Sequence, residues 1–385
     1  MKIGIDIRCL SEGRRTGVEE YTINLLRNLF EKDKKNEYIL FFNSFRNNGV
    51  DLSWIRKYEN VQVKIFFFPN KLLNFLFWYL GWPKIDKMLG GVDVFFAPNI
   101  NFLSVSRDAK LLLTFHDLSF ELFSETFSFK RRAWHFFVNP RNLARKAHKV
   151  IAISNSTKND LVNYYKINSK KISVVHNGID ESLNVIDRNN LELIRIKEDY
   201  SLPFNFILYF GTIEPRKNII GVVRMYNYLR ESRDGKLGKY KLVIAGESGW
   251  KSKEIFSEIE KSKFKDDIIV IQSVDNKDKL YLYNLATVFV YPSFFEGFGF
   301  PPLEAMSCGV PVVVSNNSSF PETVGGAAVM IDPDRPDEMF IAVRDIVHNI
   351  SLKNDLSARG LVRSRAFKWQ KTVEEFMDIL GSDCV

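Results

Sequence analysis

Residues 294–306 have the sequence Phe294-Phe295-Glu296-Gly297-Phe298-Gly299-Phe300-Pro301-Pro302-Leu303-Glu304-Ala305-Met306. The apolar runs 286–292 and 310–314 on either side predict two neighbouring buried strands. Pro301 and Pro302 favour a helix start, because the first N–H groups of a helix have no intrahelical partner. The free N–H groups of such a start can hold an anion. The stretch therefore predicts a ligand site at the carboxyl edge of a parallel sheet, flanked by Glu296 and Glu304.

Strand patterns and amphipathic helix patterns alternate along the whole chain, which predicts parallel sheets covered by helices. In the first half the expected strands are 3–7, 38–42, 61–67, 92–97, 110–115, 150–153 and 171–175. In the second half they are 205–211, 241–245, 268–271, 288–291, 310–314 and 328–331. Residues 181–203 are charged and poor in strand pattern, which predicts a linker. The fold class is therefore α/β, with two doubly wound, Rossmann-like domains over residues 1–180 and 204–369.

The composition is typical of a globular protein, with 45% hydrophobic and 26% charged residues. The three cysteines, Cys9, Cys308 and Cys384, are odd in number and far apart, so they indicate neither a disulfide framework nor a metal cluster. The N-terminus has a strand pattern in place of a signal peptide, and no run approaches the ~20 apolar residues of a membrane-spanning helix. We therefore expect a protein of the reducing cytoplasm.

The net charge of +8 is unevenly distributed. Residues 1–180 contain 28 Lys and Arg against 17 Asp and Glu, whereas the remainder contains 26 against 29. A basic first half favours an acidic partner such as membrane lipid, a phosphate-bearing substrate or nucleic acid, with a general solubility charge as the alternative. Residues 71–82 are aromatic and flanked by lysines, and residues 127–149 interleave Phe and Trp with Lys and Arg. Both patterns are typical of segments that bind an anionic membrane, and equally of helices packed on their own core.

The spacing of Glu296 and Glu304 resembles the E-x7-E signature of glycosyltransferase family 4, whose members are retaining enzymes with the two-domain GT-B fold. The resemblance extends in order from Met1 to about Leu380. It implies that Glu296 lies at the donor sugar and that Glu304 binds the ribose of the donor nucleotide. It also implies that the last helix, about 370–385, crosses back onto the first domain. The backbone groups that it places against the donor sugar and phosphates are those of Gly297, Phe298, Gly299 and Phe300.

Two adjacent cations, Arg216 and Lys217, follow the strand 205–211 and precede a helix. When a nucleoside diphosphate departs, the negative charge that grows on its β-phosphate has to be neutralised. Arg can do this with two parallel hydrogen bonds, and Lys as a point charge. The resembling family uses this pair of cations to neutralise the departing phosphate, and Gly211 lies beside them at the strand end. The alternative interpretation of the pair is a helix start whose charges are solvated. In the family the glycine loop after the first strand also approaches the donor phosphates, which assigns Gly17 and less directly Arg14, with a plain surface turn as the alternative.

His116 and Asp117 follow the expected strand 110–115. A lone His-Asp pair is also the pattern of a core or solvated histidine, but the resemblance implies that His116 lies beside the transferred sugar and that Asp117 orients the loop. Asp332-Pro333-Asp334 resembles a D-x-D metal motif, yet a proline-rich turn accounts for it better. Since Arg216 and Lys217 supply the positive charge, we expect neither a metal nor another cofactor.

The resemblance implies a hexosyltransferase that moves a sugar from a nucleoside-diphosphate donor to an acceptor hydroxyl. The sequence of residues 116–125 resembles bacterial mannosyltransferases of surface polysaccharide assembly, so the expected donor is GDP-mannose and the expected acceptor is a glycan or a lipid-linked molecule. The alternatives are a glucosyl- or other hexosyltransferase using a UDP-sugar, a GT-B nucleotide-sugar epimerase, and a non-enzymatic module that binds membrane or nucleic acid. Because Arg216, Lys217, Glu296 and Glu304 are all present, we expect an enzyme with no nucleic-acid partner, in the cytoplasm or peripheral on the inner face of the membrane.

Overall fold

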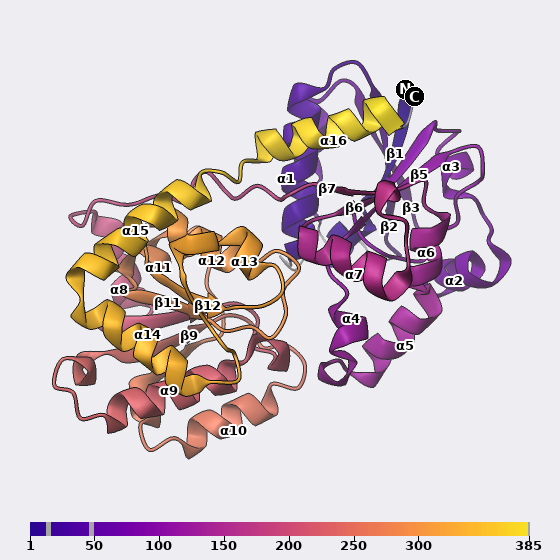
Figure 1. Cartoon of the computed structure of the whole chain (residues 1–385). Coiled ribbons are helices and arrows are strands. Elements are labelled where there is room, and N and C mark those ends of the chain that lie inside the picture. The colour runs from indigo at the N-terminus through magenta and orange to yellow at the C-terminus, as the bar shows by residue number, and fades with distance from the viewer. Residues whose placement is uncertain (13–16, 46–49, 384–385) are drawn as a thin grey trace. The chain divides into compact units, whose positions relative to one another are not determined.

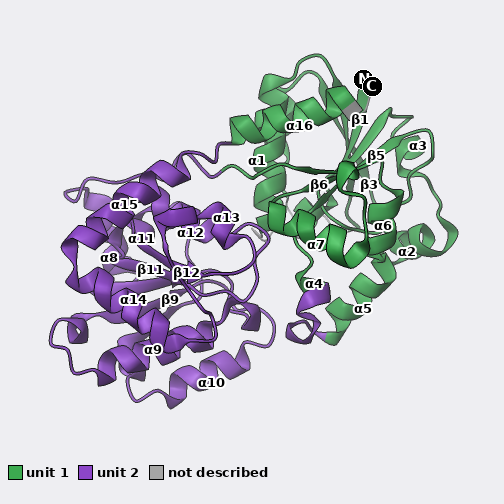
Figure 2. Cartoon of the chain, in the orientation of Figure 1, with its two compact units in different colours: residues 1–120, 129–178, 369–385 green, residues 121–128, 179–368 purple. Residues whose placement is uncertain are grey.

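The computed structural model of the chain describes residues 1–12, 17–45 and 50–383. The chain forms two compact units, shown in different colours in Figure 2. Unit 1 contains residues 1–120, 129–178 and 369–385, and unit 2 contains residues 121–128 and 179–368. Both units are α/β, which confirms the predicted fold class.

Unit 1 is built on a parallel sheet of seven strands in the order β3-β2-β1-β4-β5-β6-β7. Its central strands are hydrophobic on both faces, as expected of a parallel sheet covered by helices on both sides, and all four residues of Val94–Ala97 are buried. The strands are β1 Lys2–Asp6, β2 Glu37–Asn43, β3 Val61–Phe66, β4 Val94–Ala97, β5 Lys110–Phe115, β6 Lys149–Ala152 and β7 Ile172–Val174.

The first long helix of unit 1, α1, has one buried face. In α1 the residues Tyr21, Leu25 and Leu29 recur at helical spacing and are completely or almost completely buried. The helices are α1 Gly17–Lys32, α2 Asn70–Phe75, α3 Ile85–Met88, α5 Phe129–Val138, α6 Pro140–Lys146, α7 Asn155–Tyr165 and α16 Trp369–Asp383, with a π-helical turn at Leu76–Leu80. The short helix α4, Ser119–Leu122, begins in unit 1 and ends in unit 2.

The last helix of the chain is part of unit 1. Figure 1 shows α16 beside α1, and Lys32 of α1 donates a hydrogen bond to Glu374 of α16. The ring of Phe376 packs 4.7 Å from that of Phe96 in β4. The sheet of unit 1 is therefore covered in part by residues that lie almost 200 positions further along the chain than β7.

Unit 2 is built on a parallel sheet of six strands in the order β10-β9-β8-β11-β12-β13. The strands are β8 Phe206–Phe210, β9 Lys241–Ala245, β10 Ile268–Ile271, β11 Val288–Tyr291, β12 Val312–Ser315 and β13 Val329–Ile331. The helices are α8 Leu191–Asp199, α9 Ile219–Glu231, α10 Lys253–Lys261, α11 Lys279–Leu285, α12 Phe300–Ser307, α13 Phe320–Thr323, α14 Pro336–His348 and α15 Ile350–Ser364. The order reverses between β8 and β11, which places a topological switch point where these neighbours end.

Two segments differ from the expected division of the chain. Residues 181–203, predicted as a linker, lie in unit 2 and contain α8, whose Leu193 and Ile196 are buried. Residues 121–128 lie in unit 2 although the sequence around them belongs to unit 1. This segment is held by Trp250, whose Nε1 donates a 2.6 Å hydrogen bond to the carbonyl of Thr126 and whose ring stacks on Phe127. A contact so distant in sequence leaves no local pattern in residues 121–128 from which it could be predicted.

Candidate donor site

The candidate donor site lies in unit 2, where the neighbouring strands β8 and β11 end. The loop that follows β8 carries Gly211, Arg216 and Lys217, and the loop that follows β11 carries residues 292–299. Because the carboxyl ends of parallel strands meet at one edge of a sheet, the two loops that the sequence singled out come together there. The backbone N–H of Phe294 donates a 2.9 Å hydrogen bond to the carbonyl of Arg216, which joins the two loops directly.

The start of α12 has the geometry that its sequence predicts. Gly299 is the residue before the helix and has a left-handed backbone, with φ of 90°. A Cβ atom at this position would also lie 2.7 Å from the ring of Phe320, so both conformation and space require glycine. The two prolines occupy the first turn of the helix, as expected. The side chain of Phe298 is buried, and its ring packs edge to face on Phe367 and on Phe300, the first residue of the helix.

Arg216 and Lys217 converge on Glu296. The ammonium group of Lys217 donates a hydrogen bond to Oε1 of Glu296, and Nη1 of Arg216 lies 3.4 Å from the same oxygen. Nη1 of Arg216 also donates a 2.5 Å hydrogen bond to the carbonyl of Phe295. Ser293 donates a further hydrogen bond of 2.9 Å to Oε1 of Glu296. The carboxylate therefore sits at the meeting point of both predicted cations, although only 8% of the residue is exposed.

The electrostatics of this group follow from burial and mutual attraction. Burial acts to raise the pKa of Glu296, but Lys217 and Arg216 together lower it below its ordinary value. Burial lowers the pKa of Lys217, and the positive charge of Arg216 lowers it further, against the opposing effect of Glu296. A buried carboxylate held in its charged form by two cations is the kind of arrangement that functional sites use.

A fourth charged residue, Glu214, completes what we call the cation–carboxylate cluster of Glu214, Arg216, Lys217 and Glu296. Oε1 of Glu214 accepts a 2.9 Å hydrogen bond from Nη2 of Arg216, and only 2% of Glu214 is exposed. The sequence analysis assigned no role to Glu214. The one signal that could have identified it is its position two residues before Arg216, in a loop already assigned to the site.

Glu304 is held in a separate group of side chains. It lies in α12, is 1% exposed, and accepts hydrogen bonds from the ammonium group of Lys279 and, at 2.8 Å, from the hydroxyl of Tyr283. Both donors come from α11, where their separation by four residues places them on one face of the helix. Burial raises the pKa of Tyr283 well above its ordinary value, and the neighbouring charge of Glu304 adds to this. Sequence analysis missed Lys279 and Tyr283.

The remaining predicted residues lie in unit 1. His116 follows β5, and its Nε2 lies 2.8 Å from the carbonyl of Pro98 while its ring meets that of Tyr21 edge to face at 4.8 Å. Burial lowers the pKa of His116. Because a carbonyl only accepts, Nε2 carries the proton in the neutral ring and Nδ1 is left as an acceptor. Asp117 accepts two hydrogen bonds from Ser119, of 2.9 and 2.7 Å, and so shapes the loop.

Gly17 is the first residue of α1 and is exposed. It precedes Tyr21 by one helical turn, so it lies on the same helix that contacts His116. Arg14 lies outside the described residues. Unit 1 therefore contains Gly17 and His116, and unit 2 contains the other predicted site residues that the structure describes, namely Gly211, Arg216, Lys217, Glu296, Gly297, Phe298, Gly299, Phe300 and Glu304.

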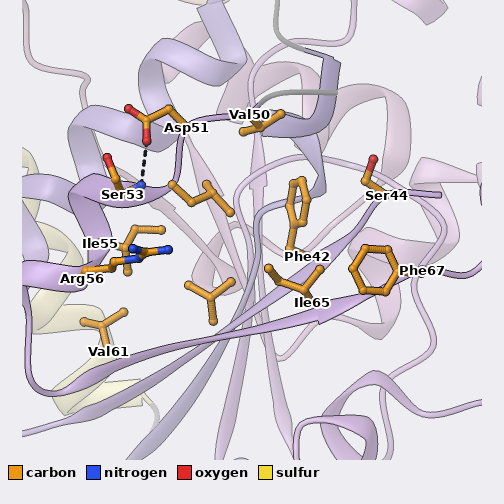
Figure 3. Close-up of a pocket in the computed structure, with 12 residues that line it drawn as sticks. Phe42, Ser44, Val50, Asp51, Ser53, Ile55, Arg56, Val61, Ile65 and Phe67 are labelled. Atoms are coloured by element: carbon orange, nitrogen blue, oxygen red, sulfur yellow. Dashed lines mark hydrogen bonds between the residues drawn. The ribbon is translucent and has the colours of Figure 1, made fainter. Parts of the chain in front are cut away.

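Two other features of the described residues, an aspartate turn and a pocket, include none of the predicted donor-site residues. Asp332 and Asp334 form a turn in which the side chain of Asp332 accepts a 2.9 Å hydrogen bond from the backbone N–H of Asp334. Within residues 1–12, 17–45 and 50–383, no group of three or more His, Cys, Asp or Glu side chains has an arrangement suited to a metal ion. A pocket of about 490 Å³ lies in unit 1 between β2, β3 and residues 50–56, and Figure 3 shows its largely apolar lining around Phe42 and Ile65. Its described lining includes none of the predicted donor-site residues.

Comparison with known proteins agrees with this fold. A sequence profile described as "Glycosyltransferase Family 4" matches residues 15–183, and one described as "Glycosyl transferases group 1" matches residues 192–362. O-antigen chain mannosyltransferase B of Escherichia coli is 33% identical over 272 residues, which cover 70% of this chain and 70% of that protein. Serotype-specific mannosyltransferase WbdA of Escherichia coli is 30% identical over 71% of this chain, and the match spans 34% of WbdA.

Solved structures share the architecture. Sucrose-phosphate synthase from Thermosynechococcus elongatus is similar with a TM-score of 0.78 and 16% identity, over 99% of this chain and 98% of that one. WaaG, a glycosyltransferase involved in lipopolysaccharide biosynthesis, is similar with a TM-score of 0.68 and 13% identity, over 99% of this chain and 100% of that one. Two parallel-sheet α/β units and these structural neighbours define the GT-B fold. The chain belongs to glycosyltransferase family 4, among the relatives of the O-antigen mannosyltransferases, and is an enzyme of the hexosyltransferase type.

Proposed function

We propose that this enzyme transfers mannose from GDP-mannose, with retention of anomeric configuration, to a hydroxyl group of a glycan or lipid-linked acceptor in surface polysaccharide biosynthesis. The observation that carries the proposal is the convergence of Arg216 and Lys217 on the buried carboxylate of Glu296. Breaking the bond between a sugar and a diphosphate places negative charge on the phosphate and positive charge on the anomeric carbon. The site contains groups of both signs, so each developing charge has a partner.

The proposed roles follow from these charges. Arg216 and Lys217 stabilise the departing diphosphate in a buried loop, where electrostatic interactions are stronger than in water. Glu296 stays ionised and faces the positive charge of the sugar. His116 supplies an acceptor at Nδ1 for a sugar hydroxyl, since Nε2 is engaged by the carbonyl of Pro98. No protein nucleophile is required: the acceptor attacks from the side on which the diphosphate leaves, and the departing phosphate takes its proton.

The choice of mannose and of a surface polysaccharide rests on the names of the relatives. The two most similar relatives reported above are mannosyltransferases, and one is assigned to the O-antigen chain. A UDP-sugar is the alternative donor, because the structure of HepE from Anabaena, 17% identical, was solved in complex with UDP-glucose. That likeness supports the fold and carries less weight for the donor than the 33% identity to a mannosyltransferase.

The donor can be tested with the purified protein by thermal shift and turnover. GDP-mannose, GDP, UDP-glucose and UDP would each be added, and the preferred nucleotide should stabilise the protein by about 2.7 kcal/mol at a hundred times its Kd. Turnover of GDP-mannose with a polysaccharide acceptor, and an α-linked product by NMR, would support the proposal. Preference for UDP-glucose would overturn the donor, a β-linked product would overturn retention, and conversion of the free donor without acceptor would indicate an epimerase.

We also propose that the enzyme binds an anionic membrane surface through an aromatic face of unit 1. This face comprises the large apolar residues exposed on α2, on the turn after it and on α5, namely Leu72, Phe75, Trp78, Tyr79, Leu80, Trp82, Phe129, Phe136 and Phe137. Trp78 and Phe137 join the two segments, because their rings meet edge to face at 5.2 Å. Phe129 is 85% and Phe136 is 79% exposed, so these side chains are not packed on the core. Leu73 and Phe77 of the same segment are buried and anchor it.

The charges around this face support a lipid partner. Lys71 lies at the start of α2, and Lys130, Arg131 and Arg132 lie in the first turns of α5, all of them exposed. Exposed aromatic residues beside cations are typical of sites that bind the interface of an anionic membrane. Each Lys or Arg near the surface contributes about 1 kcal/mol to such binding. Among the described helices none is long and apolar enough to span a bilayer. The proposed location is therefore peripheral, on the cytoplasmic side of the membrane.

Vesicle sedimentation tests this surface. Binding to vesicles that contain phosphatidylglycerol should exceed binding to neutral phosphatidylcholine vesicles and should weaken with salt, since charges are screened beyond ~10 Å at 0.1 M. The double variant Trp78→Ser, Phe136→Ser should lose binding, whereas Phe204→Ser, which removes an 88% exposed phenylalanine from unit 2, should keep it. Equal binding by both variants, or equal binding to both kinds of vesicle, would remove the aromatic face from the proposal.

A further inference from the structure

Glu214 is a buried carboxylate to which the mechanism above gives no task. It stands in extended backbone immediately before the short 3-10 turn Pro215–Lys217 that carries both cations. Its side chain is only 3% exposed. Burying a charged side chain is costly unless it is paired, so the position of Glu214 has to be explained by its partner.

That partner is Arg216. Nη2 of the guanidinium donates to Glu214 at 2.9 Å, while Nη1 donates to the carbonyl of Phe295 and faces Glu296 at 3.4 Å. The guanidinium is thus held at one end by Glu214 and at the other by the loop that carries Glu296. Fixed acceptors of this kind orient the planar guanidinium group of an arginine, whereas they would not orient the ammonium group of a lysine.

The loop that carries Glu214 is itself fixed at its far end. Asn218 has a left-handed backbone, with φ of 55°. Its side chain donates a 2.7 Å hydrogen bond to the carbonyl of Pro333 and accepts one of 3.2 Å from the N–H of Gly221. The backbone of Arg216 therefore has little freedom. The orientation of its long side chain still depends on what its guanidinium contacts.

The cation–carboxylate cluster also balances its charge. Two cations and two carboxylates, each with a side chain no more than 12% exposed, sum to zero without any substrate. When a diphosphate binds, Glu296 is needed at the sugar, whereas Glu214 has no role at the sugar and keeps its contact with Arg216. Glu214 can then hold Arg216 in place while the other partners of the two cations change.

We propose that Glu214 is a positioning residue, which acts through Arg216 to hold the guanidinium where charge develops on the departing phosphate. This inference rests on the proposed role of Arg216 and Lys217 in the transfer reaction. Glu214 itself makes no contact with the donor in this proposal. Its loss should therefore lower the rate of the chemical step and leave donor binding in the ground state nearly unchanged.

The test uses Glu214→Gln, which keeps the size of the side chain and one acceptor oxygen but removes the charge. We expect kcat to fall by about 10- to 100-fold, the effect of losing one charged hydrogen bond, and the donor KM to change less than threefold. The matched control is Asp337→Asn. Asp337 also pairs with an arginine two residues away, Arg335, at 2.7 Å, but on the surface, and its variant should keep full activity.

A double-mutant cycle separates positioning from a merely structural role. If Glu214 acts through Arg216, then Glu214→Gln should cause no further loss of turnover in the Arg216→Ala background. A second 10-fold loss in the double variant would overturn the proposal, as would a kcat for Glu214→Gln within threefold of wild type. A parallel loss of melting temperature and donor affinity in Glu214→Gln would likewise assign it a structural role.

The outcome can be distinguished from failure of the proposed function. All variants are measured with the nucleotide sugar that the wild-type enzyme turns over. If wild type transfers no sugar, the proposed function fails and the cycle is not reached. If wild type is active and the cycle is additive, only the role of Glu214 is wrong.

Discussion

Lys217 provides the sharpest test of how this site works. We consider Lys217→Met, which keeps an unbranched apolar stem but removes the ammonium group. Two unit charges about 4 Å apart interact with about 4 kcal/mol at an effective dielectric constant of 20, which corresponds to about 10³ in rate. Part of that interaction already exists in the ground state, because the bound diphosphate is charged before the bond breaks. We therefore expect kcat to fall by 10²–10³, as for other single electrostatic donors.

The pH profile should change in a definite direction. Lys217 is one of the two cations that hold the pKa of Glu296 below its ordinary value against the effect of burial. When it is removed, Arg216 at 3.4 Å and Ser293 at 2.9 Å are the described side chains that still favour the ionised form. The pKa of Glu296 should then rise, so the acidic limb of kcat should move to higher pH in Lys217→Met than in wild type.

The assay is release of the nucleoside diphosphate under saturating donor, with circular dichroism to verify the fold. Lys265→Met is the matched control, because Lys265 also pairs with a glutamate, Glu260 at 3.1 Å, but on the surface of the same unit. Turnover within threefold of wild type for both Lys217→Met and Arg216→Ala would refute the phosphate-clamp reasoning. An unchanged acidic limb would refute the assignment of Glu296 as the group that Lys217 keeps ionised.

Three further predictions follow from other contacts. Glu304→Gln should mainly raise the donor KM, whereas Glu296→Gln should mainly lower kcat, because only Glu296 faces charge that grows in the transition state. Steady-state kinetics of both variants test this, and a change in KM alone for Glu296→Gln would contradict the roles assigned to the two glutamates. Turnover should survive EDTA, whereas its loss and recovery with Mg²⁺ or Mn²⁺ would show that a metal is required. Burial, with a smaller contribution from Asp117, raises the pKa of Asp160 to about 6. Because the pKa of Asp160 is higher in the folded protein than in the unfolded chain, the free energy of unfolding falls as pH rises through about 4 to 6. Asp160→Asn removes this effect, so it should raise the melting temperature by about 2 °C at pH 8 and leave it unchanged at pH 4. The figure of about 2 °C is reduced because Asp160 is partly exposed.

The sequence was sufficient for the parts of this fold that are encoded locally. Alternating strand and helix patterns predicted both sheets, and all thirteen expected strands are present with ends shifted by at most two residues. The entry to α12 was equally predictable, because the two prolines and Gly299 each favour one backbone conformation at one position. Arg216 and Lys217 come close to Glu296 because their loops follow the neighbouring parallel strands β8 and β11, whose carboxyl ends lie at one edge of the sheet.

Partners that depend on long-range packing were not predictable in this way. Lys279 and Tyr283 meet Glu304 only because α11 packs beside α12, and nothing in the local sequence of α11 indicates which glutamate they face. The segment 121–128 joins unit 2 through Trp250, more than a hundred residues away. Glu214 was overlooked for a different reason: its role depends on the rotamer of Arg216, which a sequence does not specify.

The assignment of α16 to unit 1 has a consequence for how the chain is made. A ribosome releases the strands of unit 1 before unit 2, but the helix that covers Phe96 emerges only after residue 368. About 190 residues separate the two parts, which corresponds to roughly 10–40 s of synthesis at 5–20 residues per second. Throughout that interval the apolar face beneath α16 is open, while unit 2 already has all of its sequence by residue 368. Unit 1 is therefore completed only after the whole of unit 2 has been synthesised.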